Sequence, residues 1–141
     1  MIEEAMNLLE IRPMKSNDFT AVQRIWNESV NQGEVLYYPL TEEYFEKKFI
    51  KNAGCEPENL LAAEMDNQIV GFIHGVAPET FPLAKSGCAY LTCMLVDAAH
   101  RGRCVGKALL ETLKTQMKAR GAHTLYISSL NPVNLDWRTK T

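Results

Sequence analysis

Hydrophobic residues near the start of the chain change from a spacing of two to a helical spacing, which predicts a strand followed by a helix. The strand covers 8–13 and ends at Pro13, a residue suited to a strand end. The helix has Ser16 or Asn17 as its expected cap and stops near Gly33. Its apolar face would hold Phe19, Val22, Ile25 and Trp26.

A second, shorter helix is predicted after an aromatic loop. The loop at 34–39 contains Tyr37 and Tyr38, which could line a binding site or pack their rings on the sheet. Thr41 is placed to cap the helix. The apolar side of this helix would hold Tyr44, Phe45 and Phe49.

The middle of the chain has the pattern of a β-hairpin. Apolar runs at 60–65 and 69–76 flank Asp66, Asn67 and Gln68. These turn residues tolerate positive φ, so they favour a tight connection between two antiparallel strands.

A strand, a short loop and a long helix are predicted next. The apolar segment 89–96 is dense enough for a buried strand, and Gly121 is placed to end the helix. A last strand is expected at 124–128, which gives the element order β-α-α-β-β-β-α-β. The apolar face of the long helix repeats every four residues, at Val105, Leu109, Leu113 and Met117.

Length and composition indicate one globular domain of 141 residues, with 46% hydrophobic and 23% charged residues. The net charge of −2 gives no reason to expect a nucleic-acid or membrane partner. The N-terminus lacks the pattern of a secretory signal. The cysteines lack C-x-x-C spacing, which favours free thiols in the cytoplasm and no metal site, with a Cys55–Cys88 disulfide as the alternative. They are Cys55, Cys88, Cys93 and Cys104.

Basic and small residues between the fourth strand and the long helix point to an anion. Arg101, Arg103 and Lys107 surround Gly102 and Gly106 at the expected start of the helix. The first amides of a helix have no partners within it and attract negative charge, so phosphate is the natural ligand. Walker and dinucleotide glycine patterns are absent, which argues against other nucleotide-binding α/β domains. The alternative is an ordinary connection with solvated basic residues.

The stretch resembles the acyl-CoA signature R-x-x-G-x-G/A of the GNAT acyltransferase superfamily. Arg101 matches the leading arginine, Gly106 matches the last glycine, and Met94-Leu95-Val96 matches the preceding strand end. Cys104 departs from the pattern, since the family usually has glycine there. The resemblance implies a mixed, mostly antiparallel sheet flanked by helices, and an N-acetyltransferase that uses acetyl-CoA.

The resemblance also implies where acetyl-CoA would bind. The main chain at the end of the fourth strand would pair with pantetheine, and the loop amides would bind the pyrophosphate. Asn131, just after the fifth strand, could contact the cofactor or serve only as a turn residue before Pro132. The implied binding residues are Met94, Leu95, Val96, Arg101, Gly102, Arg103, Cys104, Val105, Gly106, Lys107 and Asn131.

The sequence does not identify the catalytic groups. Many relatives have a carboxylate on the fourth strand, and none occurs at 89–96. His74 and Glu64 are the candidates for a base, although a lone histidine on an apolar strand is more often structural and Glu64 near a turn would be solvated. The family's general acid is commonly a tyrosine after the fifth strand. The last tyrosine is Tyr126, which we expect in the core.

The family fold usually continues with another helix and two more strands. We therefore expect 1–141 to be one domain that is truncated, continued further, or completed by a second domain or a homodimer partner, because an open sheet edge favours association. The acceptor would be a small-molecule or protein amine. The competing hypothesis is a non-catalytic GNAT domain that binds CoA or supports a second domain.

Overall fold

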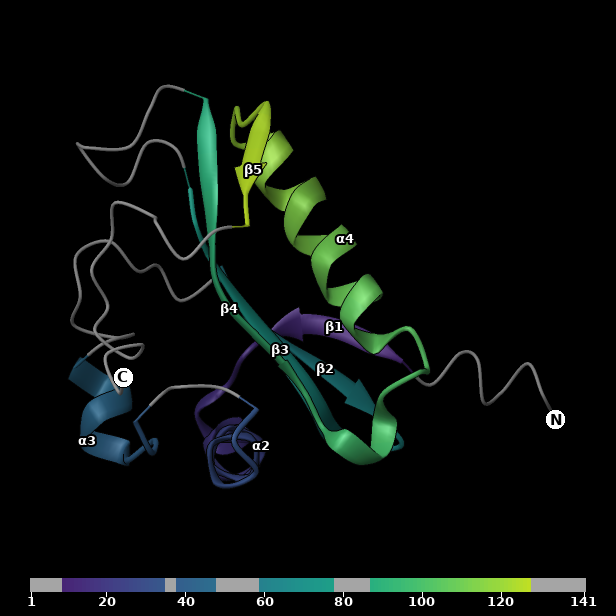
Figure 1. Cartoon of the computed structure of the whole chain (residues 1–141). Coiled ribbons are helices and arrows are strands. Elements are labelled where there is room, and N and C mark those ends of the chain that lie inside the picture. The colour runs from purple at the N-terminus through teal and green to yellow at the C-terminus, as the bar shows by residue number, and fades with distance from the viewer. Residues whose placement is uncertain (1–8, 35–37, 48–58, 78–86, 128–141) are drawn as a thin grey trace, which may run out of the picture.

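Strands from the whole length of the chain form one sheet in the computed structural model, which describes residues 9–34, 38–47, 59–77 and 87–127 (Figure 1). The strands lie in the sheet in the order of the chain, and neighbours pair antiparallel except for the last pair, which is parallel. The mixed, mostly antiparallel sheet is therefore confirmed. Its strands are β1 (Glu10–Pro13), β2 (Leu60–Met65), β3 (Gln68–Val76), β4 (Cys88–Val96) and β5 (Thr124–Tyr126).

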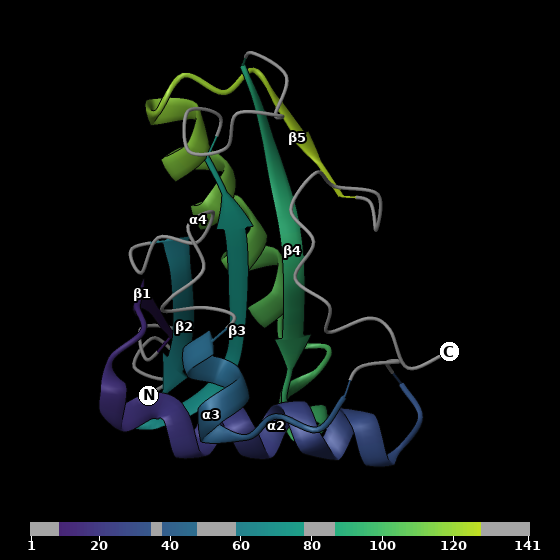
Figure 2. The same cartoon turned by 90° about the vertical axis from the view of Figure 1, so that its left-hand side faces the viewer.

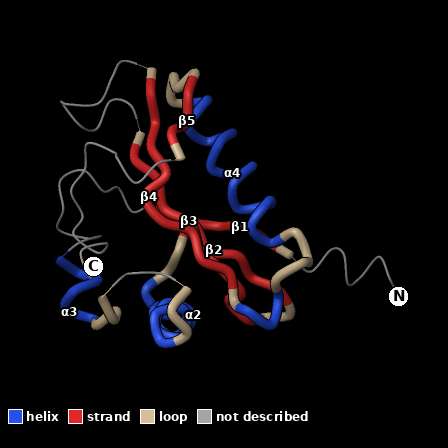
Figure 3. The backbone as a smooth tube through the Cα atoms, viewed as in Figure 1, coloured by secondary structure: helices blue, strands red, loops and turns tan. Residues whose placement is uncertain are grey.

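Helices cover both faces of the sheet. The long helix α4 (Val105–Ala119) lies along one face, while α2 (Phe19–Asn31) and α3 (Glu42–Phe45) lie on the other (Figure 1). Figure 3 shows the strands as a twisted layer between these helices. Two 3₁₀ turns, Ser16–Asp18 and Ala98–His100, lead toward α2 and α4. The predicted element order is thus confirmed within the described residues.

The helical spacing in the sequence produces the core under α4. Val105, Leu109, Leu113 and Met117 are each at most 1% exposed. The helix comes so close to β3 that a Cβ at Gly75 would lie 3.0 Å from the Leu113 side chain. A glycine on the strand therefore allows this close packing.

The opposite core combines aliphatic side chains with aromatic rings. Trp26 of α2 is completely buried and stacks on Phe72 of β3, with ring centroids 6.0 Å apart. Its indole N–H donates to the Tyr38 carbonyl oxygen at 2.7 Å, which ties the loop after α2 to the helix. α2 is thus anchored at its middle.

The hairpin turn forms as predicted, but one residue shorter. Asp66 and Asn67 have φ of 54° and 63°, as expected of residues that tolerate the left-handed region. Gln68 already belongs to β3. Thr41 caps α3 as predicted, since its hydroxyl accepts the Tyr44 amide at 3.0 Å.

Two details of the sequence interpretation are wrong. Neither Ser16 nor Asn17 caps α2; Asp18 occupies the cap position, and its carboxylate accepts the Lys15 amide at 2.8 Å. Tyr126 is not a core residue, because it is 38% exposed and stacks on Tyr90. The spacing of apolar residues could not reveal either detail, since both depend on neighbours distant in the sequence.

β4 has an irregularity in its pairing with β3, close to the point where its pairing with β5 ends. His74 pairs with Cys93 and Gly75 pairs with Leu91, so Thr92 is an extra residue on β4. β5 pairs with β4 only at its beginning, as far as Tyr90, and the two strands then diverge (Figure 2). This opening lies beside the segment that the sequence assigns to cofactor binding.

Candidate functional site

A pocket of about 620 Å³ lies between the end of β4 and the start of α4. It brings together eight of the predicted cofactor-binding residues and adds Glu34 and His100. Arg103 and Lys107 belong to the same loop and helix start but are not part of the lining, and Asn131 is outside the described residues. The predicted residues in the lining are Met94, Leu95, Val96, Arg101, Gly102, Cys104, Val105 and Gly106.

The edge of β4 that faces β5 is open along the pocket. β5 pairs with β4 at Cys88, Ala89 and Tyr90, and within the described residues no strand pairs with this edge from Leu91 to Val96. Unpaired main-chain groups at a strand edge can accept an extended ligand as an additional strand. This edge is therefore available to an extended ligand.

The start of α4 has the conformation expected of an anion-binding turn. Cys104 immediately precedes the helix with φ of 64°, and its carbonyl oxygen accepts the Ala108 amide at 3.0 Å. The amides of the first helical turn have no acceptors within α4 and lie at the pocket. They can donate to a phosphate, which the helix dipole also favours.

The positive φ at Cys104 explains why glycine is usual at this position. A residue with a side chain pays a cost in the left-handed region that glycine does not. Gly106 is different: a Cβ there would lie 3.7 Å from Val96 and 3.8 Å from Met94, which is ordinary contact. The structure therefore accounts for a motif that requires glycine at one place and accepts glycine or alanine at the other.

Arg101 forms an ion pair with Glu34, a residue to which the sequence analysis gave no role. Its guanidinium donates two hydrogen bonds to Glu34, at 2.7 and 2.8 Å, and its Nε donates to the Val96 carbonyl oxygen at 3.2 Å. The hydrogen bonds from Arg101 hold the pKa of Glu34 below its ordinary value. One signal could have revealed Glu34: a carboxylate just after a helix is unusual, because helix C-termini favour cations.

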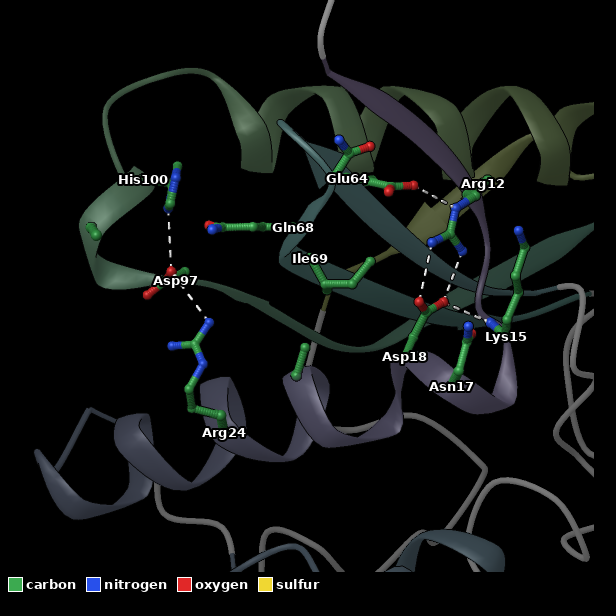
Figure 4. Close-up of a pocket in the computed structure, with 13 residues that line it drawn as sticks. Arg12, Lys15, Asn17, Asp18, Arg24, Glu64, Gln68, Ile69, Asp97 and His100 are labelled. Atoms are coloured by element: carbon green, nitrogen blue, oxygen red, sulfur yellow. Dashed lines mark hydrogen bonds and ion pairs between the residues drawn. The ribbon is translucent and has the colours of Figure 1, made fainter.

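A second, polar cavity of about 790 Å³ lies on the other side of the same loop (Figure 4). At one end Arg12 binds Asp18, at 2.8 Å, and Glu64, at 3.0 Å. At the other end Asp97 accepts from Arg24 at 3.5 Å and contacts Nδ1 of His100 at 3.2 Å. Each carboxylate therefore already has a cationic or imidazole partner within the protein.

Asp97 attaches the loop to both the sheet and α2. Its amide donates to the Val70 carbonyl oxygen at 2.8 Å, and its carboxylate binds Arg24 of α2. Burial opposes ionisation of Asp97, but the hydrogen bonds and charge of Arg24 outweigh it and keep the pKa of Asp97 below its ordinary value. Because His100 lines both cavities, this cluster borders the pocket at the start of α4 directly.

Neither candidate base lies in the lining of the pocket. His74 is completely buried, its Nδ1 is 2.5 Å from the Thr92 hydroxyl, and burial lowers its pKa to about 3. The Thr92 hydroxyl donates to the His74 carbonyl oxygen at 3.0 Å, so it accepts from Nδ1–H. Glu64 is not simply solvated as expected, because it is half-buried and paired with Arg12.

The sequence model of a protein family matches most of the chain. The model of the Acetyltransferase (GNAT) family matches residues 21–136, which include the whole β4–loop–α4 unit. The chain belongs to the GNAT acetyltransferase family. No curated protein matches it in sequence.

Solved structures support the GNAT assignment. The N-acetyltransferase from Staphylococcus aureus Mu50 is 26% identical with a TM-score of 0.65, over 94% of this chain and 81% of that one. A GCN5-related N-acetyltransferase from Kribbella flavida is 25% identical, also with a TM-score of 0.65, over 82% and 68% of the two chains.

A third likeness concerns the fold alone. N-acetylglutamate synthase from Neisseria gonorrhoeae, solved with coenzyme A and N-acetylglutamate, is 20% identical with a TM-score of 0.61. The match includes 81% of the present chain but only 23% of the length of the synthase.

Other properties of the GNAT chain come from the described residues. They contain no group of three or more His, Cys, Asp or Glu side chains that could hold a metal ion. None of the described helices has the length and hydropathy needed to cross a membrane. Cys88, Cys93 and Cys104 form no disulfide within the described part of the chain, and Cys55 is outside it.

Proposed function

We propose that this chain is an N-acetyltransferase that transfers the acetyl group of acetyl-CoA to an amine. The observation that supports this most is the pocket at the β4–α4 junction, where an open strand edge continues into an anion-binding helix start. An acyl-CoA has both features that this pocket would recognise, an extended arm with amides and a pyrophosphate.

In this proposal main-chain groups do most of the binding. The edge of β4 at Met94–Val96 pairs with the pantetheine amides, and the amides from Gly102 to Lys107 donate to the pyrophosphate. Arg103 and Lys107 are exposed and form no ion pair among the described residues, so their charges are available to phosphate. Side chains in the loop need only be small or directed outward.

The reaction requires an unprotonated amine to attack the carbonyl carbon of the thioester. The C–N bond forms, the C–S bond breaks, and CoA leaves as a thiolate that takes up a proton, while the amine loses one. A main-chain amide near Met94 or Leu95 is placed to donate to the carbonyl oxygen as negative charge develops. The proton acceptor remains unassigned, since a histidine with a pKa of about 3 is a poor base at neutral pH.

A non-catalytic domain that binds CoA is the second candidate. β4 has no carboxylate, and His74 and Glu64 both lie outside the pocket lining. Either activity suits a cytoplasmic protein with reduced thiols. An amine acceptor, small or on a protein, is consistent with the range of GNAT neighbours, such as an aminoglycoside acetyltransferase solved with sisomicin.

Substitution at Gly106 tests the cofactor site. Gly106→Glu places bulk and negative charge against the phosphate position, so acetyl-CoA binding measured by calorimetry should be lost while circular dichroism stays unchanged. Gly106→Ala is the matched control and should bind, because its Cβ meets only ordinary contacts. Unchanged affinity in Gly106→Glu would rule out this pocket as the cofactor site.

Thiol release with a panel of amines then separates the two candidates. An acetyltransferase releases CoA in proportion to an acceptor amine, and the release disappears in Gly106→Glu. Binding without release from any amine would favour the non-catalytic domain.

A further inference from the structure

We infer that Glu34 is a positioning residue for the cofactor site, and that Arg101 acts as a strut between α2 and the phosphate loop rather than as a phosphate ligand. We call the ion pair of these two side chains the Glu34–Arg101 bridge. The inference rests on the proposed CoA function for the meaning of the loop, but the bridge itself is a feature of the described structure.

The end of α2 fixes where Glu34 lies. Gly33 has φ of 73°, a left-handed conformation that commonly ends a helix, and the Glu34 amide donates back to the Ser29 carbonyl oxygen at 3.0 Å. The Glu34 side chain therefore lies next to the loop before α4, and it lines the pocket together with Arg101. The turn thus presents Glu34 to the loop from a well-anchored helix.

Arg101 already uses three of its five N–H donors on acceptors within the protein. Nη1 and Nη2 each donate to one oxygen of Glu34, at 2.8 and 2.7 Å, and Nε donates to the Val96 carbonyl oxygen. A bidentate arginine–carboxylate pair fixes orientation as well as distance. The carboxylate also cancels most of the positive charge that Arg101 would offer to an anion.

The bridge connects three parts that must keep a fixed geometry for CoA to bind. Val96 is the last residue of the open β4 edge, Arg101 lies in the loop, and Glu34 belongs to the end of α2. Arg103 and Lys107 lack such partners among the described residues. The structure therefore divides the basic residues of the motif into one strut and two charges available to the ligand.

A double-mutant cycle on CoA binding tests the bridge. Glu34→Gln and Arg101→Gln should each weaken CoA binding by about fivefold, the upper end for an exposed ion pair, and the double variant should be no weaker than either single variant. Glu111→Gln is the matched control, since it removes the same charge from an exposed ion pair of α4 with Lys114 and should not change CoA affinity. Tighter binding by Glu34→Gln, or no change in either single variant, would overturn the inference.

The salt dependence of binding distinguishes a strut from a phosphate ligand. Arg101→Gln should keep the wild-type change of affinity with salt, whereas Arg103→Gln should reduce it, because only a charge that contacts the ligand is screened in this way. A reduced salt dependence in Arg101→Gln would assign Arg101 to the phosphate.

Hydrogen exchange without ligand separates failure of the bridge from failure of the proposed function. The amides of 98–104 should exchange faster in both Glu34→Gln and Arg101→Gln than in the wild type and Glu111→Gln, whether or not CoA binds. Unchanged exchange in both variants would refute the strut. Faster exchange in the variants, combined with a wild type that binds no CoA, would refute only the assignment of the pocket.

Discussion

The two faces of the sheet are built differently, although both are buried. Under α4 the core cluster is apolar, and the helix contributes only aliphatic side chains and a methionine. The buried polar residue on this side is Asn59, which accepts from Arg120 at the end of α4 at 3.4 Å. Under α2 the apolar core is accompanied by buried polar groups, each held by hydrogen bonds. These include Asp18, Ser29, His74 and Thr92.

One face is held mainly by apolar packing, whereas the other combines packing with hydrogen bonds between buried polar groups. An apolar face that is tightly packed has one arrangement, so α4 and the loop at its start are fixed relative to β4. Buried polar groups cost free energy unless they are paired, so they persist where hydrogen bonds hold them in place.

The largest expected effect is on the apolar face. Leu113→Ala removes a completely buried side chain beside Gly75 and should lower the free energy of unfolding by about 3 kcal/mol, because the cavity cannot collapse against a glycine. Denaturant unfolding measures this loss. Lys114→Ala, exposed on the next position, should change stability by less than about 0.5 kcal/mol. Similar losses of unfolding free energy in the two variants would show that packing of α4 on the sheet does not stabilise this face.

The polar face should respond to charge and pH. Asp18→Asn weakens the hydrogen bonds from Arg12 and the Lys15 amide, so unfolding at neutral pH should become easier by about 2 kcal/mol. Burial opposes ionisation of Asp18, but these bonds outweigh it and hold its pKa below the ordinary value.

The same variant has a pH signature with a definite sign. The ionised Asp18 stabilises the fold fully above the pKa of an unfolded aspartate, about 4, and this contribution is lost as pH falls through the lower folded pKa. The difference between wild type and Asp18→Asn in urea unfolding should therefore shrink on acidification. A difference that grows instead would mean that Asp18 is protonated in the fold.

The smallest expected effect is at the loop where α4 begins. Cys104→Gly relieves the left-handed conformation and should raise the unfolding free energy by up to about 1 kcal/mol, after part of the gain is lost to the freedom of glycine in the unfolded chain. Cys104→Ala retains a side chain at the same φ and is the control. Equal melting temperatures for the two variants would indicate that this turn is not strained.

The sequence predicted the apolar face and the hairpin because both depend on local patterns. The four-residue repeat from Val105 to Met117 needs only a flat apolar surface to become a buried helix, and Asp66-Asn67 forms its turn without distant partners. The motif from Arg101 to Gly106 located the pocket for the same reason. Its residues are contiguous and share one turn.

The polar contacts could not be predicted because they join residues far apart in the chain. Glu34 and Arg101 are 67 positions apart, and Arg12 and Glu64 are 52 apart. No spacing rule connects such pairs before the strands are in register. The pocket's location was therefore predictable, whereas the electrostatic role of each residue in it was not.

The order of strands in the sheet has a consequence for how the protein forms. Since each strand lies beside its predecessor in the chain, the sheet can grow from one edge as the polypeptide leaves the ribosome. The hairpin of β2 and β3 and its neighbour β4 need only nearby partners, and β5 alone must wait for α4 to cross the sheet. β5, which leaves the edge of β4 unpaired beyond Tyr90, is thus the last of the described strands to be added, after α4 has been synthesised.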